Sequence, residues 1–364
     1  MAKDDESLSR IDLLRFPLIV GVVFIHNYAS AVHLAQGGAI GLAHGSVWVE
    51  FVRFFISQGV ARVAVPLFFL ISGYLFFYGE WSWSRYIGKI ERRASTLLIP
   101  FLFWNLLTLA VYATVQSIPQ TAVYFAGTAW PPIRSFTLLD YINALFGITV
   151  ANPISYQFWF IRDLMALVVL APAIHFLLAK RLALPFILAL LCLWFTYTWP
   201  VLWPSVEATF FFSLGGYLSC KEKNITYLDK FGPWMSILFL GSLTLHAAFP
   251  DTMPYLIKVV ILFGVPSFWW LTKLAVRTDR LKSWLVRLSG ASFFVFAAHE
   301  PLLSVFRKVS YKLFMPTSGA AILALYFLIP FSLIALLVVI HHYLQKVAPS
   351  FVSFIAGGSS RSNK

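Results

Sequence analysis

Three residues with chemically useful side chains lie near the start of the chain. Arg15 and His26 are separated by ten residues, and Asp12 precedes Arg15 by three. At about 100° per residue of an α-helix, Arg15 and His26 are turned only about 20° from each other, and Asp12 lies about 60° from Arg15. The spacing therefore predicts one helical stripe that carries an acid, a cation and an imidazole, with His26 roughly 16 Å beyond Arg15 along the axis.

The chemistry expected of this stripe centres on the imidazole. A neutral imidazole can act near pH 7 as a general base towards an alcohol, or as a nucleophile that holds an acyl group. His26 is the candidate for either role. The sequence leaves two structural alternatives open: Asp12 and Arg15 as an interfacial ion pair that anchors the helix end, and His26 as a buried residue bonded to a neighbouring helix.

Two further apolar segments carry ionisable residues. YQFWFIRDLMALVVLAP contains Arg162 and Asp163, and FFVFAAHEPLL contains His299 and Glu300. Both pairs are expected at an outer depth similar to that of His26, where mutual pairing lowers the cost of burying charge. We predict that three helices build one polar layer, in which Arg162, Asp163 and His299 orient a substrate or the imidazole. For Arg162 and Asp163, a structural ion pair is the alternative.

The elements that carry these residues must lie in a membrane. Of the 364 residues, 59% are hydrophobic and 12% are charged, and the mean hydropathy is +0.78. A water-soluble fold could not bury this much apolar surface. Runs such as LVVLAPAIHFLL are apolar on all sides, which favours helices over the alternating pattern of a barrel. We therefore expect an all-α, polytopic integral membrane protein.

Apolar stretches separated by turn signals and charged breaks predict about ten transmembrane helices. We expect a cytoplasmic tail at 1–9, a membrane domain at 10–346 and a second cytoplasmic tail at 347–364. The predicted spans are 11–33, 55–78, 97–117, 157–179, 183–200, 204–220, 232–249, 253–275, 286–306 and 320–345. An even number of spans places both termini on the same side.

The distribution of basic residues indicates which side that is. With cytoplasmic termini, far more Lys and Arg residues fall inside than outside, as the positive-inside rule requires. The net charge of +13 is therefore attributed to topology and lipid contact, and no nucleic-acid partner is expected. Cys192 and Cys220 form neither a disulfide framework nor a metal-binding pattern, so no metal is predicted. The N-terminal MAKDDESLSR lacks the features of a signal peptide.

A basic segment, RYIGKIERRASTLLIP, precedes the third predicted span. Lys89, Arg92 and Arg93 are explained by topology and by contact with anionic lipid. They also suit an anion site for a donor that carries several phosphates, because Arg binds phosphate with two parallel hydrogen bonds.

Taken together, these segments resemble the acyltransferase-3 family of bacterial membrane O-acyltransferases. The resemblance covers about residues 8–346. It is carried in order by RIDLLRFPLIVGVVFIHNYAS, VPLFFLISGYLFF at 65–77, the basic stretch ending in TLLIP, FWFIRDL at 158–164 and SFFVFAAHEPLL at 292–303.

This resemblance implies a ten-helix enzyme of the bacterial inner membrane. Such an enzyme takes an acyl group, usually acetyl, from cytoplasmic acyl-CoA and passes it to a hydroxyl of a glycan or lipid-linked saccharide. The family's essential Arg and His match Arg15 and His26. Its paired-arginine motif matches Arg93 and Thr96, so the second position is not basic here, and Arg92 or Lys89 would supply the missing charge of the donor site.

Two other classes of function fit the same residues. In a proton-coupled transporter or permease, the buried His, Arg and Asp residues would form a proton relay. In a non-enzymatic component of polymer export, both histidines would be replaceable. We find no internal repeat in the sequence and no helices broken by Gly or Pro at matching positions, and the absence of these two features disfavours the transporter.

Overall fold

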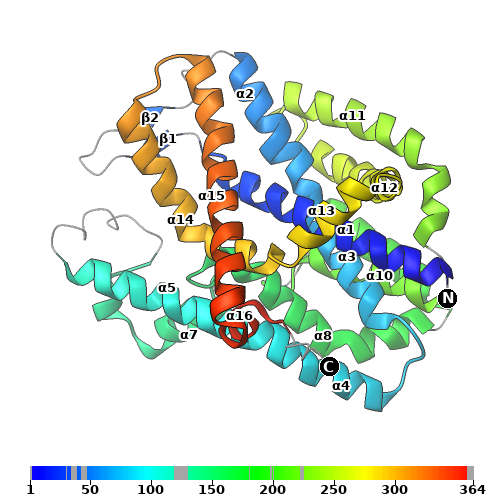
Figure 1. Cartoon of the computed structure of the whole chain (residues 1–364). Helices are drawn as coiled ribbons and strands as arrows, with labels where there is room; N and C mark the ends of the chain where they lie inside the picture. Colours follow the sequence, from blue (N-terminus) through cyan, green and yellow to red (C-terminus); the bar gives the residue numbers. More distant parts are fainter. Residues whose placement is uncertain are drawn as a thin grey trace.

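The computed structural model describes residues 2–29, 31–33, 39–41, 47–118, 130–179, 181–196, 199, 201–221 and 225–358 (Figure 1). Helices dominate this part of the chain. They are α1 (Ala2–Asn27), α2 (Val47–Phe54), α3 (Ala64–Phe77), α4 (Trp83–Arg93), α5 (Ile99–Ser117), α7 (Leu138–Phe146), α8 (Trp159–Ala179), α9 (Ala183–Thr196), α10 (Val206–Cys220), α11 (Gly232–Ala248), α12 (Leu256–Val276), α13 (Asp279–Ser289), α14 (Ser292–Phe314), α15 (Gly319–Val347) and α16 (Pro349–Ala356).

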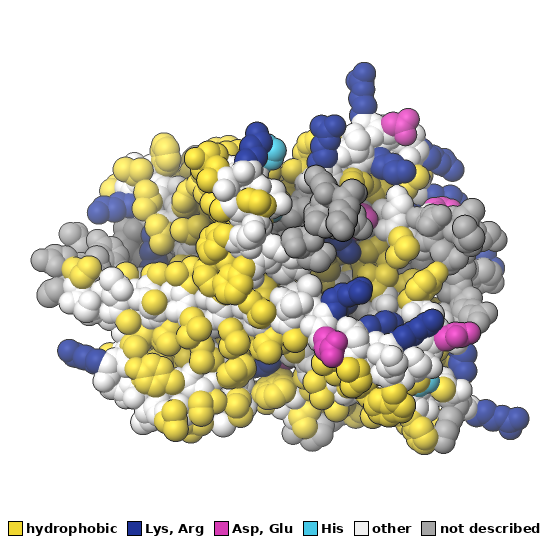
Figure 2. Space-filling model, turned by 60° about the horizontal axis from the view of Figure 1, so that its bottom comes forward, with side chains coloured by type: hydrophobic (Ala, Val, Ile, Leu, Met, Phe, Trp, Pro, Cys, Tyr) yellow, Lys and Arg dark blue, Asp and Glu magenta, His cyan; other side chains and the backbone are white. Residues whose placement is uncertain are grey.

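The predicted polytopic helical membrane architecture is confirmed. Each predicted span contains a helix, and within the described residues five helical segments are long and apolar enough to cross a membrane, or six if the bent pair α13 and α14 is one span. Figure 2 shows a surface whose middle is covered by hydrophobic side chains, with Lys and Arg gathered towards the right of the view. The count of ten spans and the placement of the termini remain predictions.

Three boundaries differ from the sequence-based prediction. The first helix ends at Asn27 instead of continuing to residue 33, because β1 (Ala31–His33) follows and pairs antiparallel with β2 (Ala39–Gly41). The predicted N-terminal tail at 1–9 is helical from Ala2 onwards. The predicted tail at 347–364 contains α16, whose Val352 and Ile355 are buried against the membrane domain.

Two of the long segments contain π-helix. Between α2 and α3 lie a π-turn, η1 (Phe55–Gly59), and a 3₁₀-turn, η2 (Val60–Val63), so the helix starts at Val47 and not at the predicted residue 55. Between α4 and α5 lies a second π-turn, η3 (Ala94–Leu98), which joins the basic segment and the third span into one helix, Trp83–Ser117. A π-turn inserts one residue into a helix and is often found at functional sites.

The helices around α1 pack closely. α3 and α10 approach through Gly73 and Gly215, where an added Cβ would lie 2.0 Å from the backbone oxygen of Phe212 and of Leu70, respectively. Small residues of this kind let two helix backbones come into contact in a membrane.

A set of hydrogen bonds made by Arg10, which we call the Arg10 brace, holds the first span in place. Arg10 is fully buried, donates two hydrogen bonds of 2.7 Å to Asp229, one to Thr272 and one to the backbone oxygen of Trp269, and lies over the Trp269 ring. The brace therefore sets the position of α1, which carries Arg15 and His26.

The helix that carries His299 is broken at Glu300, inside the predicted span 286–306. Glu300 has φ −108° and ψ 137°, outside the helical region, and Pro301 follows it. A residue before proline is driven towards extended backbone, and proline lacks the N–H that would bond to the carbonyl four residues earlier. The side chain of Gln157 donates to this carbonyl, the backbone oxygen of Ala297, at 3.3 Å.

Candidate active site

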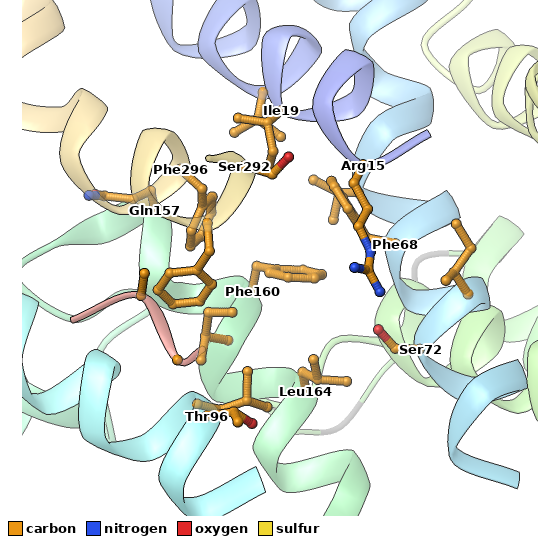
Figure 3. Close-up of a pocket in the computed structure, with 18 of the residues that line it drawn as sticks. Arg15, Ile19, Phe68, Ser72, Thr96, Gln157, Phe160, Leu164, Ser292 and Phe296 are labelled. Atoms are coloured by element: carbon orange, nitrogen blue, oxygen red, sulfur yellow. The ribbon is translucent and has the colours of Figure 1, made fainter. Parts of the chain in front are cut away.

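A cavity of about 420 Å³ runs beside α1, and the predicted stripe forms one wall of it. Arg15, Ile19, Val22 and His26 all line this cavity, so the face shared by Arg15 and His26 is confirmed, whereas Asp12 does not line it. Arg15 directs its guanidinium into the open space towards Ser72, opposite Phe160 of α8 (Figure 3). We call this space the His26 cavity.

Several other elements close the His26 cavity around α1. α3 contributes Phe68 and Ser72, α8 contributes Phe160 and Leu164, and α14 contributes Phe296, each labelled in Figure 3. The basic segment contributes Arg93, Thr96 and Leu97, and smaller parts of the wall come from η6 (Tyr156–Phe158), α13 and α16. The cavity therefore has arginines at one end, apolar walls along its length and an imidazole at the other end.

Asp12 and Arg15 form the ion pair that their spacing predicts. The Nη1 of Arg15 lies 3.1 Å from Oδ1 of Asp12, and the two side chains are 47% and 43% exposed. An exposed pair of this kind adds little stability, typically about 0–1 kcal/mol, so it does not hold the fold together. The pair instead places the Arg15 guanidinium at the cavity wall, where it is accessible to an anion.

The rings of His26 and His299 pack against each other in a tilted arrangement, and of the two only His26 lines the cavity. Their ring centroids are 5.2 Å apart with an interplanar angle of 32°, and the ring of Tyr156 meets His26 edge-on at 4.9 Å. The predicted meeting of the first and ninth spans is thus present in the structure. The guanidinium of Arg307 donates to the backbone oxygen of His26 at 3.1 Å, which fixes the end of α1.

The hydrogen bonds of His299 define which of its nitrogens is available. Nδ1 lies 2.7 Å from the backbone oxygen of Phe296, and a carbonyl oxygen only accepts, so Nδ1 carries the proton of the neutral ring. Nε2 then holds the free lone pair. This atom is buried and has no hydrogen-bond partner among the described residues. A buried polar atom left unpaired costs about 1–3 kcal/mol, which favours a bound group as its partner.

Gln157 has a similar free acceptor. Its amide nitrogen is used on Ala297, while its Oε1 is buried without a partner in the described part of the chain. Gln157 also lines the His26 cavity. The sequence analysis did not single out Gln157. The signal that could have found it is Pro301, because the missing N–H of this proline frees the carbonyl that Gln157 binds.

Glu300 is engaged on both oxygens. It accepts hydrogen bonds from the hydroxyl of Tyr156 at 3.1 Å and from that of Ser304 at 3.0 Å. Because the same Tyr156 ring contacts His26, Glu300 holds the tyrosine that packs against the imidazole. Tyr156 was also absent from the sequence-based candidates.

Arg162 and Asp163 form the structural ion pair that was the alternative to a direct role. Arg162 donates to Oδ1 of Asp163 at 3.0 and 3.2 Å and to the backbone oxygens of Gly147 and Ala151. Oδ2 of Asp163 accepts from the backbone N–H of Ser205. Neither residue lines the His26 cavity. The pair joins α8 to the loop after α7 and to the start of α10.

The loop bound by Arg162 follows a well-capped helix. The hydroxyl of Thr137 accepts from the N–H of Asp140 at the start of α7, and the Asp140 carboxylate accepts from the Thr137 N–H. The hydrogen bonds from Thr137 hold the pKa of Asp140 below its usual value.

The structure separates the three predicted donor-site cations of the basic segment. Arg93 lines the His26 cavity, together with Arg15. Lys89 instead donates to the backbone oxygen of Phe76 and does not line this cavity. Arg92 is exposed and lines a neighbouring hollow.

Comparison with known proteins decides the family. A family model described as an acyltransferase domain, Acyl_transf_3, matches residues 8–341. The chain belongs to the acyltransferase-3 family. This acyltransferase is similar to the succinoglycan biosynthesis protein ExoH of Rhizobium meliloti (strain 1021), with 28% identity over 357 residues that cover 96% of this chain and 92% of the relative. No solved structure matches it. The family predicted from the sequence is thereby confirmed, and the chain is a membrane acyltransferase.

Proposed function

We propose that the protein transfers an acyl group, most simply acetyl, from cytoplasmic acyl-CoA to a hydroxyl of an envelope glycan or lipid-linked saccharide. The observation that carries this proposal is the His26 cavity, which connects Arg15 and Arg93 with the imidazole of His26. The similarity to a succinoglycan biosynthesis protein supports a saccharide as acceptor.

The shape of the cavity suits a thioester on a long, thin arm. Arg15 and Arg93 lie where charged phosphates would meet the protein, because guanidinium groups bind phosphate with charge-assisted hydrogen bonds. The apolar walls formed by Phe68, Phe160 and Phe296 exclude water from the arm. The free Oε1 of Gln157 is an acceptor for an amide N–H of the arm, close to the reacting end.

In the proposed reaction, His26 acts as general base. It takes the proton of the acceptor hydroxyl while the oxygen attacks the thioester carbonyl. The new C–O bond forms, the C–S bond breaks, and the proton passes from the imidazole to the departing thiolate of CoA. The free Nε2 of His299 accepts a hydrogen bond from the acceptor hydroxyl or from the His26 ring, and so orients the reacting groups.

The same proposal includes the topology. Ten helices cross the bacterial inner membrane, both termini are cytoplasmic, and the Arg15 end of the cavity faces the cytoplasm. The helices found at all ten predicted ranges and the bias of basic residues support this arrangement.

The proposal is tested with radiolabelled acetyl-CoA and membranes that contain the wild-type protein or His26→Ala. We expect label to become covalently attached to a saccharide fraction with the wild type and not with the variant. A proton-coupled transporter would move its substrate unchanged and leave the saccharide unlabelled. Transfer at the wild-type rate by His26→Ala would contradict the role of His26.

A second measurement separates general-base catalysis from an acyl-imidazole intermediate. Without acceptor, a general base leaves acetyl-CoA intact. A burst of free CoA equal to the amount of enzyme would show instead that His26 carries the acyl group.

A further inference from the structure

A charged residue lies beyond His26, on the side away from Arg15. The residues of α3 that line the His26 cavity include four that recur every three or four positions, as one face of a helix does: Val65, Phe68, Ser72 and Leu75. Arg62 precedes Val65 by three residues, in the turn η2, and so continues this face past the cavity. Arg62 is exposed and interacts electrostatically with His26. A group bound at Arg62 would therefore lie on the imidazole side of the cavity.

The guanidinium of Arg62 is held by one neighbour and keeps free donors. Its Nε and Nη2 both donate to Oε1 of Gln58, which lies one turn earlier, and the first of these hydrogen bonds measures 2.9 Å. Within the part of the chain that the structure describes, Arg62 makes no ion pair, and its remaining N–H groups have no acceptor. A cation without a counter-ion among membrane helices is a candidate for ligand binding.

A carboxylate from another helix lies near Arg62. Glu207, in the first turn of α10, interacts electrostatically with Arg62, but the two described side chains form no ion pair. Oε2 of Glu207 accepts from the indole N–H of Trp194 at 3.2 Å, and Oε1 accepts no hydrogen bond from the described residues. Free donors on Arg62 and a free acceptor on Glu207 are thus held apart from each other.

The packing of Trp194 fixes the position of this carboxylate. Trp194 is buried, and its ring stacks on that of Phe210 with the centroids 5.6 Å apart. Lys258 of α12 is also buried and donates to the backbone oxygens of Trp194 and Phe195 in the last turn of α9. Glu207 therefore belongs to a built arrangement of α9, α10 and α12, unlike a loose surface side chain.

The two charges select a class of ligand. An anion would be attracted by Arg62 but repelled by Glu207, and a cation would meet the reverse. A hydroxyl group both donates and accepts, so neighbouring hydroxyls of a sugar ring can accept from the guanidinium and donate to the carboxylate. We propose that Arg62 and Glu207 form the subsite that binds the accepting sugar residue through its hydroxyls, beside His26. This inference rests on the proposed function and names residues that select its acceptor.

The test uses the full-length protein in nanodiscs, radiolabelled acetyl-CoA and unacylated saccharide extracted from a strain that lacks the protein. The variants are Arg62→Gln and Glu207→Gln, each of which removes one charge and keeps a polar side chain. The matched controls are Arg134→Gln and Asp251→Asn, which remove the same charges at exposed positions outside this subsite. The KM for the saccharide, the KM for acetyl-CoA and the kcat are measured for each folded protein.

We expect Arg62→Gln and Glu207→Gln each to raise the KM for the saccharide about 10-fold, because a hydrogen bond between a charged group and a hydroxyl is lost. The KM for acetyl-CoA and the kcat at saturating saccharide should stay within about threefold, since the donor does not contact this subsite. Arg134→Gln and Asp251→Asn should leave all three values unchanged.

Three outcomes would overturn the inference. An unchanged KM for the saccharide in either variant excludes a subsite formed by both charges. A higher KM in Arg62→Gln with a lower one in Glu207→Gln would show that an anionic group binds there, and not hydroxyls. Loss of folding, or an equal rise in the KM for acetyl-CoA, would assign the two residues to the fold. If the wild type transfers no acetyl group from acetyl-CoA to the saccharide, the proposed function itself fails, and this result is separate from the other three.

Discussion

Two pairs of ionisable residues at similar predicted depth have opposite surroundings. Arg162 and Asp163 use their polar atoms on each other and on the backbone of Gly147, Ala151 and Ser205. His26 instead lines a cavity and its ring packs against that of His299, whose Nε2 has no partner in the described structure. Unused hydrogen-bonding capacity next to a cavity thus distinguishes the candidate reactive pair from the structural pair, although both pairs are costly to bury.

Replacing the imidazole in the first helix is the sharpest way to break this comparison. His26→Ala should lower acyl transfer about 10²- to 10⁴-fold, the range expected for a lost general base. The measurement is the rate of saccharide acetylation per folded molecule. His175→Ala is a matched control, because His175 stacks on Trp81 outside the cavity, and it should retain the wild-type rate.

The second histidine should have a smaller effect. His299→Ala removes the free Nε2 but leaves His26 in place, so we expect kcat to fall about 5- to 150-fold, equivalent to a loss of about 1–3 kcal/mol. Single-turnover kinetics with saturating acetyl-CoA would measure this loss. A wild-type kcat in a folded His299→Ala protein would remove His299 from the reaction.

The arginine at the other end of the cavity should affect binding more than turnover. Arg15→Ala should raise the KM for acetyl-CoA about 10-fold while kcat changes less, because the lost contact is made to the bound donor before and during reaction. Arg15→Lys keeps the charge but loses the planar guanidinium, so its KM for acetyl-CoA should lie between those of the wild type and Arg15→Ala. A fall in kcat alone would place Arg15 at the reacting atoms.

The structural pair should show the smallest effect on turnover and a clear effect on stability. Arg162→Ala leaves Asp163 buried without its cation, and breaking a buried pair in this way costs about 3–5 kcal/mol. We expect thermal unfolding at a lower temperature, with kcat per folded molecule close to that of the wild type. Arg134→Ala, at an exposed arginine, is the control and should not change stability. A folded, stable Arg162→Ala protein without activity would restore the direct role predicted from sequence.

Much of the site followed from helical spacing. The stripe from Arg15 to His26 needs only the 100° step of an α-helix. The break beside His299 was not predicted, although the missing N–H and the steric effect of Pro301 explain it. Gln157 and Tyr156 were not predicted, because their importance depends on which distant helix they meet. The different surroundings of Arg162 and His299 likewise depend on packing between helices, which one sequence does not encode locally.

The C-terminal segment and the π-turn before α5 show the same limit of prediction from sequence, because both depend on contacts between distant helices or on local helix geometry. The segment 347–364 was assigned as a tail because it follows the last long apolar run, but α16 packs back onto α5 and carries Gly357 to the cavity wall. The π-turn at Ala94–Leu98 was also outside prediction, since one inserted residue leaves no trace in hydropathy.

The central claim is that the donor enters the His26 cavity, and the accessibility of Ser72 tests it most directly. Ser72 lines the cavity close to the Arg15 guanidinium (Figure 3), and Ser72→Cys can be studied after Cys192 and Cys220 are replaced by serine. We predict that a maleimide reagent labels this cysteine and that saturating acetyl-CoA slows the labelling at least 10-fold. Labelling at an unchanged rate while the same protein turns over acetyl-CoA would contradict the account.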